Sequence, residues 1–242
     1  MALSVDIRKA LGNFHLAVQF DAGDETLALL GASGCGKSVT LKCIAGILTP
    51  DEGHIELDGV TLYDSASRIN LPPQRRQVGY LFQQYALFPW LTVEKNVQFG
   101  LKLQGKSNEE AEEIARKYLK MVDLEGFAKA YPKELSGGMK QRVAIARAYA
   151  VNPKVLLMDE PFGALDVKTR RELQALMNRL WMQEDRDRKK TAVFVTHDID
   201  EALLLADRIV FMADGQILEE NTPDEFFGHP KTERAKDFLS KI

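Results

Sequence analysis

The feature that most constrains this fold is a glycine-rich loop between a short apolar run and a helical pattern. The string Gly31-Ala32-Ser33-Gly34-Cys35-Gly36-Lys37-Ser38 follows the apolar residues 27–30 and opens a helix that extends to about Ala45. Glycines let backbone N–H groups turn inward around an anion, and the helix N-terminus adds a positive dipole. The loop therefore predicts phosphate binding, with Lys37 at the β and γ oxygens and the Ser38 hydroxyl on Mg²⁺. A merely flexible glycine loop is the alternative.

Short aliphatic and β-branched runs alternate with helical patterns along the chain, and this alternation predicts a parallel sheet covered by helices. Near the N-terminus, residues 53–57 followed by Asp58-Gly59-Val60 have the form of a hairpin, so an antiparallel sheet is expected beside the parallel core. The runs that predict strands are residues 26–30, 78–82, 155–158, 192–195 and 209–212.

A long, mostly helical insertion separates the second of these runs from the third. It extends from Val93 to about Ala150, and Ser107-Asn108-Glu109-Glu110 is a capping box that opens a helix through Met121. The charged run at residues 184–190 predicts a solvated loop, and Thr222-Pro223-Asp224-Glu225 predicts the start of a short terminal helix. We therefore expect an inserted α-helical subdomain within an α/β fold.

Composition excludes several classes of protein and of partner. The chain has 32 basic and 35 acidic residues, so its net charge is −3. The chain as a whole therefore lacks the excess positive charge that favours binding to nucleic acid or anionic lipid. No apolar run approaches the ~20 residues that cross a bilayer, and no secretory signal opens the sequence. The only two cysteines, Cys35 and Cys43, fit a reducing compartment. The cytoplasm is the expected location.

Two carboxylates end the apolar run at residues 155–158. In a strand buried on both faces, the tip would deliver Asp159 to the Mg²⁺ shell. Glu160 points differently because it lies one residue further, and it is placed to hold and polarise an attacking water as general base. A helix N-cap or plain surface acids are the alternatives for this pair.

A second possible phosphate site lies at the end of the helical insertion. Ser136, Gly137 and Gly138 precede a helix predicted over residues 142–150, which makes a second anion-binding helix terminus. Because the first loop already wraps the phosphates from its own side, this terminus would cover the γ-phosphate from the opposite side, in a second subunit. An ordinary serine N-cap with glycines for packing is the alternative.

These strings together resemble the ATP-binding cassette (ABC) family over nearly the whole chain. The glycine loop is similar to its Walker A motif, residues 135–141 to its LSGGQ-like signature, and residues 155–160 to Walker B with the catalytic glutamate. Gln83 corresponds to the Q-loop, and Ala164-Leu165-Asp166 to the D-loop. The resemblance implies a single ABC ATPase domain over residues 1–242: a P-loop NTPase parallel core, an N-terminal antiparallel β subdomain and a helical subdomain at about 93–150.

The resemblance also assigns roles to individual residues. His197 corresponds to the switch histidine that contacts the γ-phosphate, although on the residues alone a histidine after a strand is more often structural. The implied catalytic residues are Glu160, His197 and Gln83, and the implied metal ligands are Ser38, Gln83 and Asp159. The implied nucleotide-binding residues are Gly31, Ala32, Ser33, Gly34, Cys35, Gly36, Lys37, Ser38, Phe14, Ser136, Gly137, Gly138 and Asp166.

Two positions depart from the family pattern. The signature has Met139 where the family usually has glutamine, with Gln141 two residues on, and substitution there leaves activity expected. No aromatic for the adenine stack is obvious near the N-terminus. Phe14 is the candidate, and core packing is its alternative.

Within the family, residues 71–83 and the start at residues 11–14 look most like importer subunits for molybdate, with sulfate and polyamine importers close. Residues 157–166 are shared with nitrate, sulfonate and taurine importers. The resemblance implies ATP and Mg²⁺ as cofactors, a second copy and separate membrane permease subunits as partners, a solute-binding protein indirectly, and a place at the cytoplasmic face of the membrane. Because the sequence ends at Ile242, no C-terminal regulatory domain is expected. A soluble ABC ATPase unrelated to transport is the alternative function.

Two further expectations concern exposed groups. The string Tyr85-Ala86-Leu87-Phe88-Pro89-Trp90-Leu91 is unusually apolar and directly follows Gln83, so it either closes the small core beside the helical subdomain or lines a groove for a permease helix. Cys35 lies at a helix N-terminus beside Lys37 and is expected to react quickly with alkylating agents, whereas Cys43 is expected to be buried.

Overall fold

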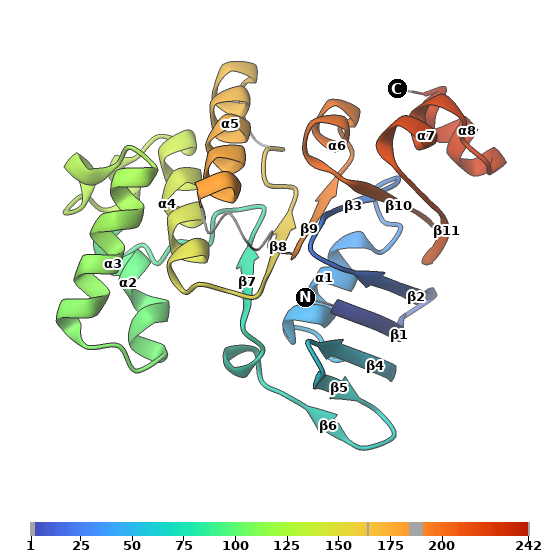
Figure 1. The fold of residues 1–242 in the computed structure, drawn as a ribbon, viewed down its shortest axis with the longest axis horizontal. Coiled ribbons are helices and arrows are strands. Elements are labelled where there is room, and N and C mark those ends of the chain that lie inside the picture. The colour runs from blue at the N-terminus through green and yellow to red at the C-terminus, as the bar shows by residue number, and fades with distance from the viewer. Residues whose placement is uncertain (1–2, 164, 184–190, 242) are drawn as a thin grey trace.

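The strands form one eleven-stranded sheet in the order β6-β5-β4-β1-β2-β11-β10-β3-β9-β8-β7 (Figure 1). The computed structural model describes residues 3–163, 165–183 and 191–241. The strands are β1 Leu3–Leu11, β2 Phe14–Ala22, β3 Thr26–Leu30, β4 Glu52–Leu57, β5 Val60–Asp64, β6 Ile69–Asn70, β7 Val78–Leu81, β8 Val155–Asp159, β9 Thr191–Thr196, β10 Arg208–Ala213 and β11 Gln216–Asn221.

The sheet has a parallel half and an antiparallel half. Strands β10, β3, β9, β8 and β7 pair in parallel, in that order. Strands β2, β1, β4, β5 and β6 pair antiparallel and extend the sheet on the other side, and β11 joins the halves by pairing parallel with β2 and antiparallel with β10. The expected parallel core with an N-terminal antiparallel sheet is confirmed, including the hairpin at Asp58-Gly59.

The helices lie on both faces of the parallel half and beyond its β7 edge, where Figure 1 shows α2 and α3. In the part of the chain that the structure describes, none is long and apolar enough to cross a bilayer. The helices are α1 Lys37–Ala45, α2 Val93–Leu103, α3 Asn108–Met121, α4 Gly137–Ala150, α5 Val167–Gln183, α6 Ile199–Leu205, α7 Pro223–Gly228 and α8 Glu233–Leu239, with 3-10 turns at Pro73–Arg75, Glu125–Phe127 and Pro132–Glu134.

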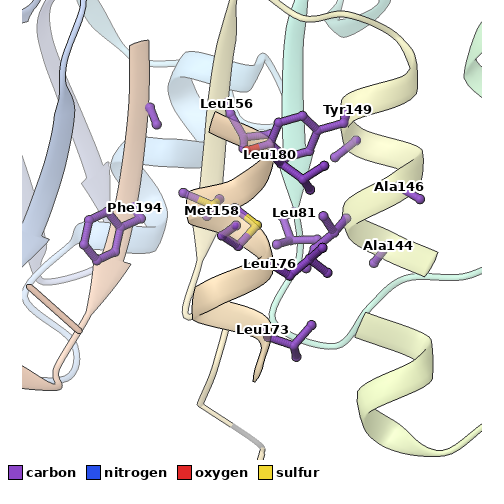
Figure 2. Packing of buried hydrophobic residues seen from close by; sticks show 14 of the residues in the cluster. Leu81, Ala144, Ala146, Tyr149, Leu156, Met158, Leu173, Leu176, Leu180 and Phe194 are labelled. Carbon is purple, nitrogen blue, oxygen red and sulfur yellow. The ribbon is translucent and has the colours of Figure 1, made fainter. Parts of the chain in front are cut away.

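Alternating side chains of the parallel strands build two separate cores, because successive residues of a strand point to opposite faces. On one face, Leu156 and Met158 of β8 pack with residues of α4 and α5 such as Tyr149 and Leu176 (Figure 2). On the other face, Val155 and Leu157 of β8 and Val193 and Val195 of β9 pack against α1 and the N-terminal strands. The parallel half of the sheet is therefore covered by α4 and α5 on one face and by α1 with the N-terminal strands on the other.

Local capping signals account for several helix starts. The Ser107 side chain accepts a hydrogen bond from the Glu110 amide and the Glu110 side chain accepts one from the Ser107 amide, so the predicted capping box of α3 is confirmed. Thr222 caps α7 as predicted. The helix predicted over residues 142–150 begins earlier, at Gly137, because Ser136 is its N-cap and accepts from the Met139 amide. The charged run at residues 184–190 lies outside the described residues.

Candidate functional site

The carboxyl ends of four parallel strands meet at one edge of the sheet, and the candidate residues follow them. Because β3, β9, β8 and β7 are neighbours and run in the same direction, their ends bring together segments far apart in sequence. The phosphate loop follows β3, Asp159 ends β8, His197 follows β9 and Gln83 comes two residues after β7. This edge is the candidate active site.

The phosphate loop is a turn that requires glycine. Gly31 has φ +150°, and a Cβ there would lie 2.1 Å from the Met212 carbonyl oxygen of β10. Gly36, the N-cap of α1, has φ +109°. The Lys37 side chain is buried, and its Nζ donates to the carbonyl oxygens of Gly31 at 2.6 Å and Ala32 at 2.9 Å. The loop thus holds the Lys37 ammonium group against its own carbonyl oxygens, beside the N-terminus of α1.

A hydroxyl and a carboxylate meet where a metal ligand pair was expected. The Ser38 Oγ donates to Asp159 Oδ1 at 2.6 Å. Tyr80, in β7, donates its hydroxyl to the other oxygen, Asp159 Oδ2, at 3.1 Å. Burial and the nearby Asp159 carboxylate raise the pKa of Tyr80, so the hydroxyl stays protonated. Sequence reasoning missed Tyr80, since nothing in the pattern of an apolar strand marks one tyrosine as facing a carboxylate on the neighbouring strand.

Glu160 lies between the two other residues expected in catalysis. Its Oε2 accepts from Gln83 Nε2 at 2.8 Å, and its Oε1 lies 3.6 Å from His197 Nδ1. Glu160 has a left-handed backbone with φ +46°, and its amide donates to the Val195 carbonyl. The regular strand therefore ends at Asp159, and the Glu160 side chain does not continue the alternation of β8. The structure brings Gln83, Glu160 and His197 together, with the His197 side chain 59% exposed.

A partly buried hydrogen-bond network holds the segment that carries His197. Thr196 Oγ1 donates to Glu201 Oε2 at 2.6 Å and accepts from the Asp198 amide at 3.0 Å. Arg170 of α5 donates to Asp198 Oδ2 at 2.6 Å, and its Nε lies 3.9 Å from Glu201 Oε1. Burial raises the pKa of Glu201 despite the Thr196 hydrogen bond. This network, which sequence reasoning also missed, fixes both sides of His197.

The expected signature residues lie at the beginning of α4, where Ser136 is the N-cap and Gly137 the first helical residue. Ser136 and Gly137 are exposed, and a Cβ on Gly137 would lie 3.3 Å from the Tyr85 hydroxyl. A Cβ on Gly138 would lie 2.6 Å from the Thr169 methyl of α5, so glycine permits this close approach. None of the signature residues is among those that line the pocket beside the phosphate loop.

Gln141 and Asp166 have partners within the chain. Gln141 is buried and donates its amide to the Pro161 carbonyl, which ties α4 to the segment after Glu160. Asp166 is exposed and accepts from the Thr169 amide and hydroxyl at 3.0 and 2.7 Å, and the hydroxyl bond lowers the pKa of this carboxyl. Asp166 is thus a cap at the start of α5. Ala164, in the expected D-loop, lies outside the described residues.

Phe14 lines a pocket of about 660 Å³ next to the phosphate loop. The end of its ring would lie 3.1 Å from a Cβ on Gly36, and the residue is only partly buried. The remaining walls come from Ala32, Ser33, Gly34 and Cys35 of the loop, from the β10–β11 turn, and from Arg234, Asp237, Phe238 and Lys241 in and just after α8. Both readings of Phe14 fit this position, because the ring faces the pocket and packs on the P-loop.

The expectation of an accessible Cys35 thiol is wrong. Cys35 is 6% exposed, and its Sγ lies against the Cβ position of Gly31 and 3.7 Å from Lys37 Nζ. The loop curls over the thiol, so a helix N-terminus in the sequence did not imply access from solvent. Cys43 is fully buried as expected, and burial raises its pKa to about 12.

The aromatic string after Gln83 is partly packed against the core and partly exposed. Tyr85 and Leu87 pack against the core that includes the helices of residues 93–150. Trp90 is 70% exposed and contacts Phe88, whose ring lies 4.5 Å from that of Phe99 on α2. The outer part of the string is therefore an exposed aromatic surface.

Comparison with known proteins agrees with this geometry. The family model described as ABC transporter matches residues 15–163. The chain is 46% identical over 97% of its length to a sulfate/thiosulfate import ATP-binding protein CysA of Bacillus cereus, and it spans about 63% of the length of that relative. It is 50% identical over 84% of its length to an uncharacterized ABC transporter ATP-binding protein of Methanocaldococcus jannaschii, 70% of which is covered.

Solved structures show the same fold. A dimeric ATP-binding cassette in a post-hydrolysis state bound to ADP and Pi has a TM-score of 0.77 and 34% identity, over 92% of this chain and 99% of that one. The family model covers more than half of the chain, and sulfate importers, one of the importer types that the sequence was expected to resemble, are among the relatives. The chain therefore belongs to the ABC transporter family and has the fold of its ATP-binding cassettes.

Proposed function

We propose that this chain is the ATP-binding and ATP-hydrolysing subunit of an importer. The observation that carries the proposal is the meeting of Ser38, Asp159, Gln83, Glu160 and His197 at one sheet edge, beside a glycine loop that encloses Lys37. The similarity to import ATP-binding proteins supports the transport role over a soluble ABC ATPase unrelated to transport.

The residues divide into a group that binds and a group that acts on water. Residues 31–38 would receive the phosphates with their amides, and Lys37 would exchange the carbonyls of Gly31 and Ala32 for phosphate oxygens. Glu160 would accept a proton from the attacking water, because Gln83 donates to one of its oxygens and so positions the carboxylate, with His197 beside the other oxygen. His197 would also contact the γ-phosphate, and Phe14 would stack on the base.

The donor set at Ser38 and Asp159 fits Mg²⁺. This cation prefers oxygen ligands and is commonly held by one or two carboxylates together with substrate phosphates. Ser38 Oγ and Asp159 Oδ1 are 2.6 Å apart, as two ligands of one small cation can be, and Gln83 would complete the protein's share. When bound, Mg²⁺ would neutralise charge on the phosphates.

A second copy of the chain would complete each site. Ser136 and Gly137 are exposed at the N-terminus of α4, and neither they nor the half-buried Gly138 line the pocket beside the phosphate loop of their own chain. In a dimer, this terminus and Asp166 would face the nucleotide held by the other copy. The dimeric cassettes among the similar structures support this arrangement.

The assembly we propose acts at the cytoplasmic face of the membrane. Residues 1–242 would work as one ATPase domain, with residues 93–150 as the helical subdomain that meets the permease. Separate permease subunits would carry the solute, and a solute-binding protein would deliver it. An oxyanion is the proposed solute class, such as sulfate, molybdate, nitrate or a sulfonate, and the names of the sulfate/thiosulfate import relatives favour sulfate among these.

The test is reconstitution of the chain with its co-encoded permease in lipid. We expect the permease to capture the chain and to raise its Mg²⁺-dependent ATPase activity when the solute-loaded binding protein is added. ATPase activity without any permease capture would support the soluble alternative, and absence of ATP hydrolysis in all conditions would refute the enzyme assignment.

A further inference from the structure

The segment at residues 84–88 is held in an unusual backbone conformation. Tyr85 has φ +55° and Ala86 has φ +47°, so two successive residues with side chains occupy the left-handed region. L-residues avoid this region because the Cβ approaches the following carbonyl, and only glycine visits it at no cost. Such a pair persists only where surrounding contacts enforce it.

One guanidinium supplies those contacts. Arg147 of α4 donates from Nη1 to the Ala86 carbonyl at 2.6 Å and from Nη2 to the Tyr85 carbonyl at 2.9 Å. The guanidinium carbon of Arg147, Cζ, also lies 5.8 Å from the centre of the Phe88 ring. The planar fork of arginine matches two adjacent oxygens in a way that a single ammonium does not. Arg147 therefore donates hydrogen bonds to both of the residues that have the strained backbone conformation.

Among the residues that the structure describes, Arg147 has no carboxylate partner. No Asp or Glu in the part of the chain that the structure describes lies within ion-pair distance of Arg147, whereas Arg142 on the same helix contacts Asp123 and Glu172. Burial lowers the pKa of Arg147 to about 10, which still leaves it charged at neutral pH. Arg147 is half-buried, and a partly desolvated cation is costly unless it is well hydrogen-bonded, so these two carbonyls are its main compensation.

Both ends of the segment are fastened to other parts of the molecule. At its start, Gln83 donates to Glu160. At its end, the buried Asn96 of α2 accepts from the Phe88 amide at 2.8 Å and donates to the Phe88 carbonyl at 3.2 Å. The Tyr85 hydroxyl lies 3.3 Å from the Cβ position of Gly137, at the beginning of α4. The segment thus links the glutamate of the site to the signature helix.

We propose that Arg147 is a positioning residue for the reaction: it latches residues 84–88 in the strained conformation that keeps Gln83 against Glu160. Without the latch, the Tyr85-Ala86 peptide relaxes and Gln83 loses its fixed position, while the phosphate loop is untouched. This inference rests on the proposed ATPase function for its kinetic consequence. Its conformational consequence is independent of any activity.

The test combines hydrogen exchange of the nucleotide-free chain with steady-state ATPase kinetics. In Arg147→Met, we expect exchange at the Tyr85 and Phe88 amides to rise about tenfold or more, the effect of losing a charge-assisted hydrogen bond. We expect kcat to fall by a similar factor, with KM for ATP within about twofold of the wild type, because the phosphate contacts remain. Exchange in the strands around the phosphate loop should not change.

Two further variants make the result specific. Arg142→Met is the matched control on the same helix, and it should leave exchange at residues 85–88 and kcat unchanged. Ala86→Gly in the Arg147→Met background should restore part of both, since glycine adopts the left-handed conformation without strain. A purely structural loss of packing would not be rescued in this way.

Three outcomes would overturn the latch: unchanged local exchange in Arg147→Met, exchange raised equally throughout the core, or no rescue by Ala86→Gly. If Arg147→Met does not fold, Arg147→Lys takes its place. We then expect a smaller rise in local exchange and a smaller fall in kcat, and the same three outcomes would overturn the latch. If the wild type hydrolyses no ATP, the proposed function fails, and local exchange with its rescue still decides the latch.

Discussion

The phosphate loop and the segment that follows β7 border the same site but are built in opposite ways. The loop is enclosed, and its buried Lys37 is bonded to carbonyls of the loop itself. The segment at residues 83–90 carries two left-handed non-glycine residues, an exposed Gln83 and a Trp90 that is 70% exposed. One side of the site is therefore preformed by its own chain segment, whereas the other depends on distant groups, Arg147 and Asn96. We infer that binding belongs to the first side and control of hydrolysis to the second.

The largest effect is expected from replacing Glu160, which lies where the two sides of the site meet. We expect Glu160→Gln to lower ATP turnover by about 10²- to 10⁴-fold, the effect of losing a positioned general base. Phosphate release under saturating Mg-ATP measures it, with the exposed Glu109→Gln on α3 as a control that should be unchanged. Wild-type turnover in Glu160→Gln would remove Glu160 from the reaction.

A substitution at the C-terminal end of α1 tests how firmly the phosphate-loop side is held. The buried Arg76 donates to the Cys43 and Ile44 carbonyls and so caps the C-terminus of that helix. Arg76→Leu should lower the free energy of unfolding by about 2 to 3 kcal/mol, because buried carbonyls lose their donors. Urea denaturation measures the change. Arg75→Leu, at the exposed neighbouring position, should change stability by less than about 0.5 kcal/mol, and equal effects would refute the cap.

A pH titration tests the network behind His197, which belongs to the second side. Burial raises the folded-state pKa of Glu201 above its ordinary value of 4.5. A raised pKa means that the native state binds more protons, so this contribution to stability is fully present below the unfolded pKa and is lost as pH rises through the folded pKa. We expect the unfolding free energy of Glu201→Gln to fall less than that of the wild type across this window. Parallel curves for the two proteins would contradict the shift.

The smallest expected effect is at the outer end of the segment after β7. Because Trp90 is largely exposed, Trp90→Ala should change the stability of the isolated chain by no more than about 0.5 kcal/mol and leave its basal ATPase activity unaltered. It should weaken capture by the permease in a pull-down. A variant that unfolds would instead indicate a core role, and full permease-stimulated activity would show that Trp90 does not contact the permease.

Local sequence signals predicted most of the first side and little of the second. Glycines at fixed offsets after an apolar strand specified the phosphate loop, and the box at Ser107 specified the start of α3, because both depend on neighbours within a few residues. Arg147, Tyr80 and Glu201 act through partners between five and 79 residues away, which no spacing reveals. Nor did composition mark Tyr85 or Ala86 as left-handed, since neither is a glycine or an asparagine.

The same limit explains the error at Cys35. The position of that residue at a helix start was read correctly, but its burial follows from how the loop folds back over the Gly31 backbone. Sequence pattern specifies which atoms of a loop are adjacent along the chain. The access of solvent to them depends on the three-dimensional path of the loop.

Equilibrium ATP binding to the wild type, Lys37→Ala and Glu160→Gln, measured side by side without turnover, tests the central claim most directly. The division into a binding side and a hydrolysis side predicts that Glu160→Gln binds ATP as tightly as the wild type. It predicts that Lys37→Ala binds about tenfold or more weakly, since a charge-assisted contact to phosphate is lost. Weakened binding in Glu160→Gln, or wild-type affinity in Lys37→Ala, would contradict the division.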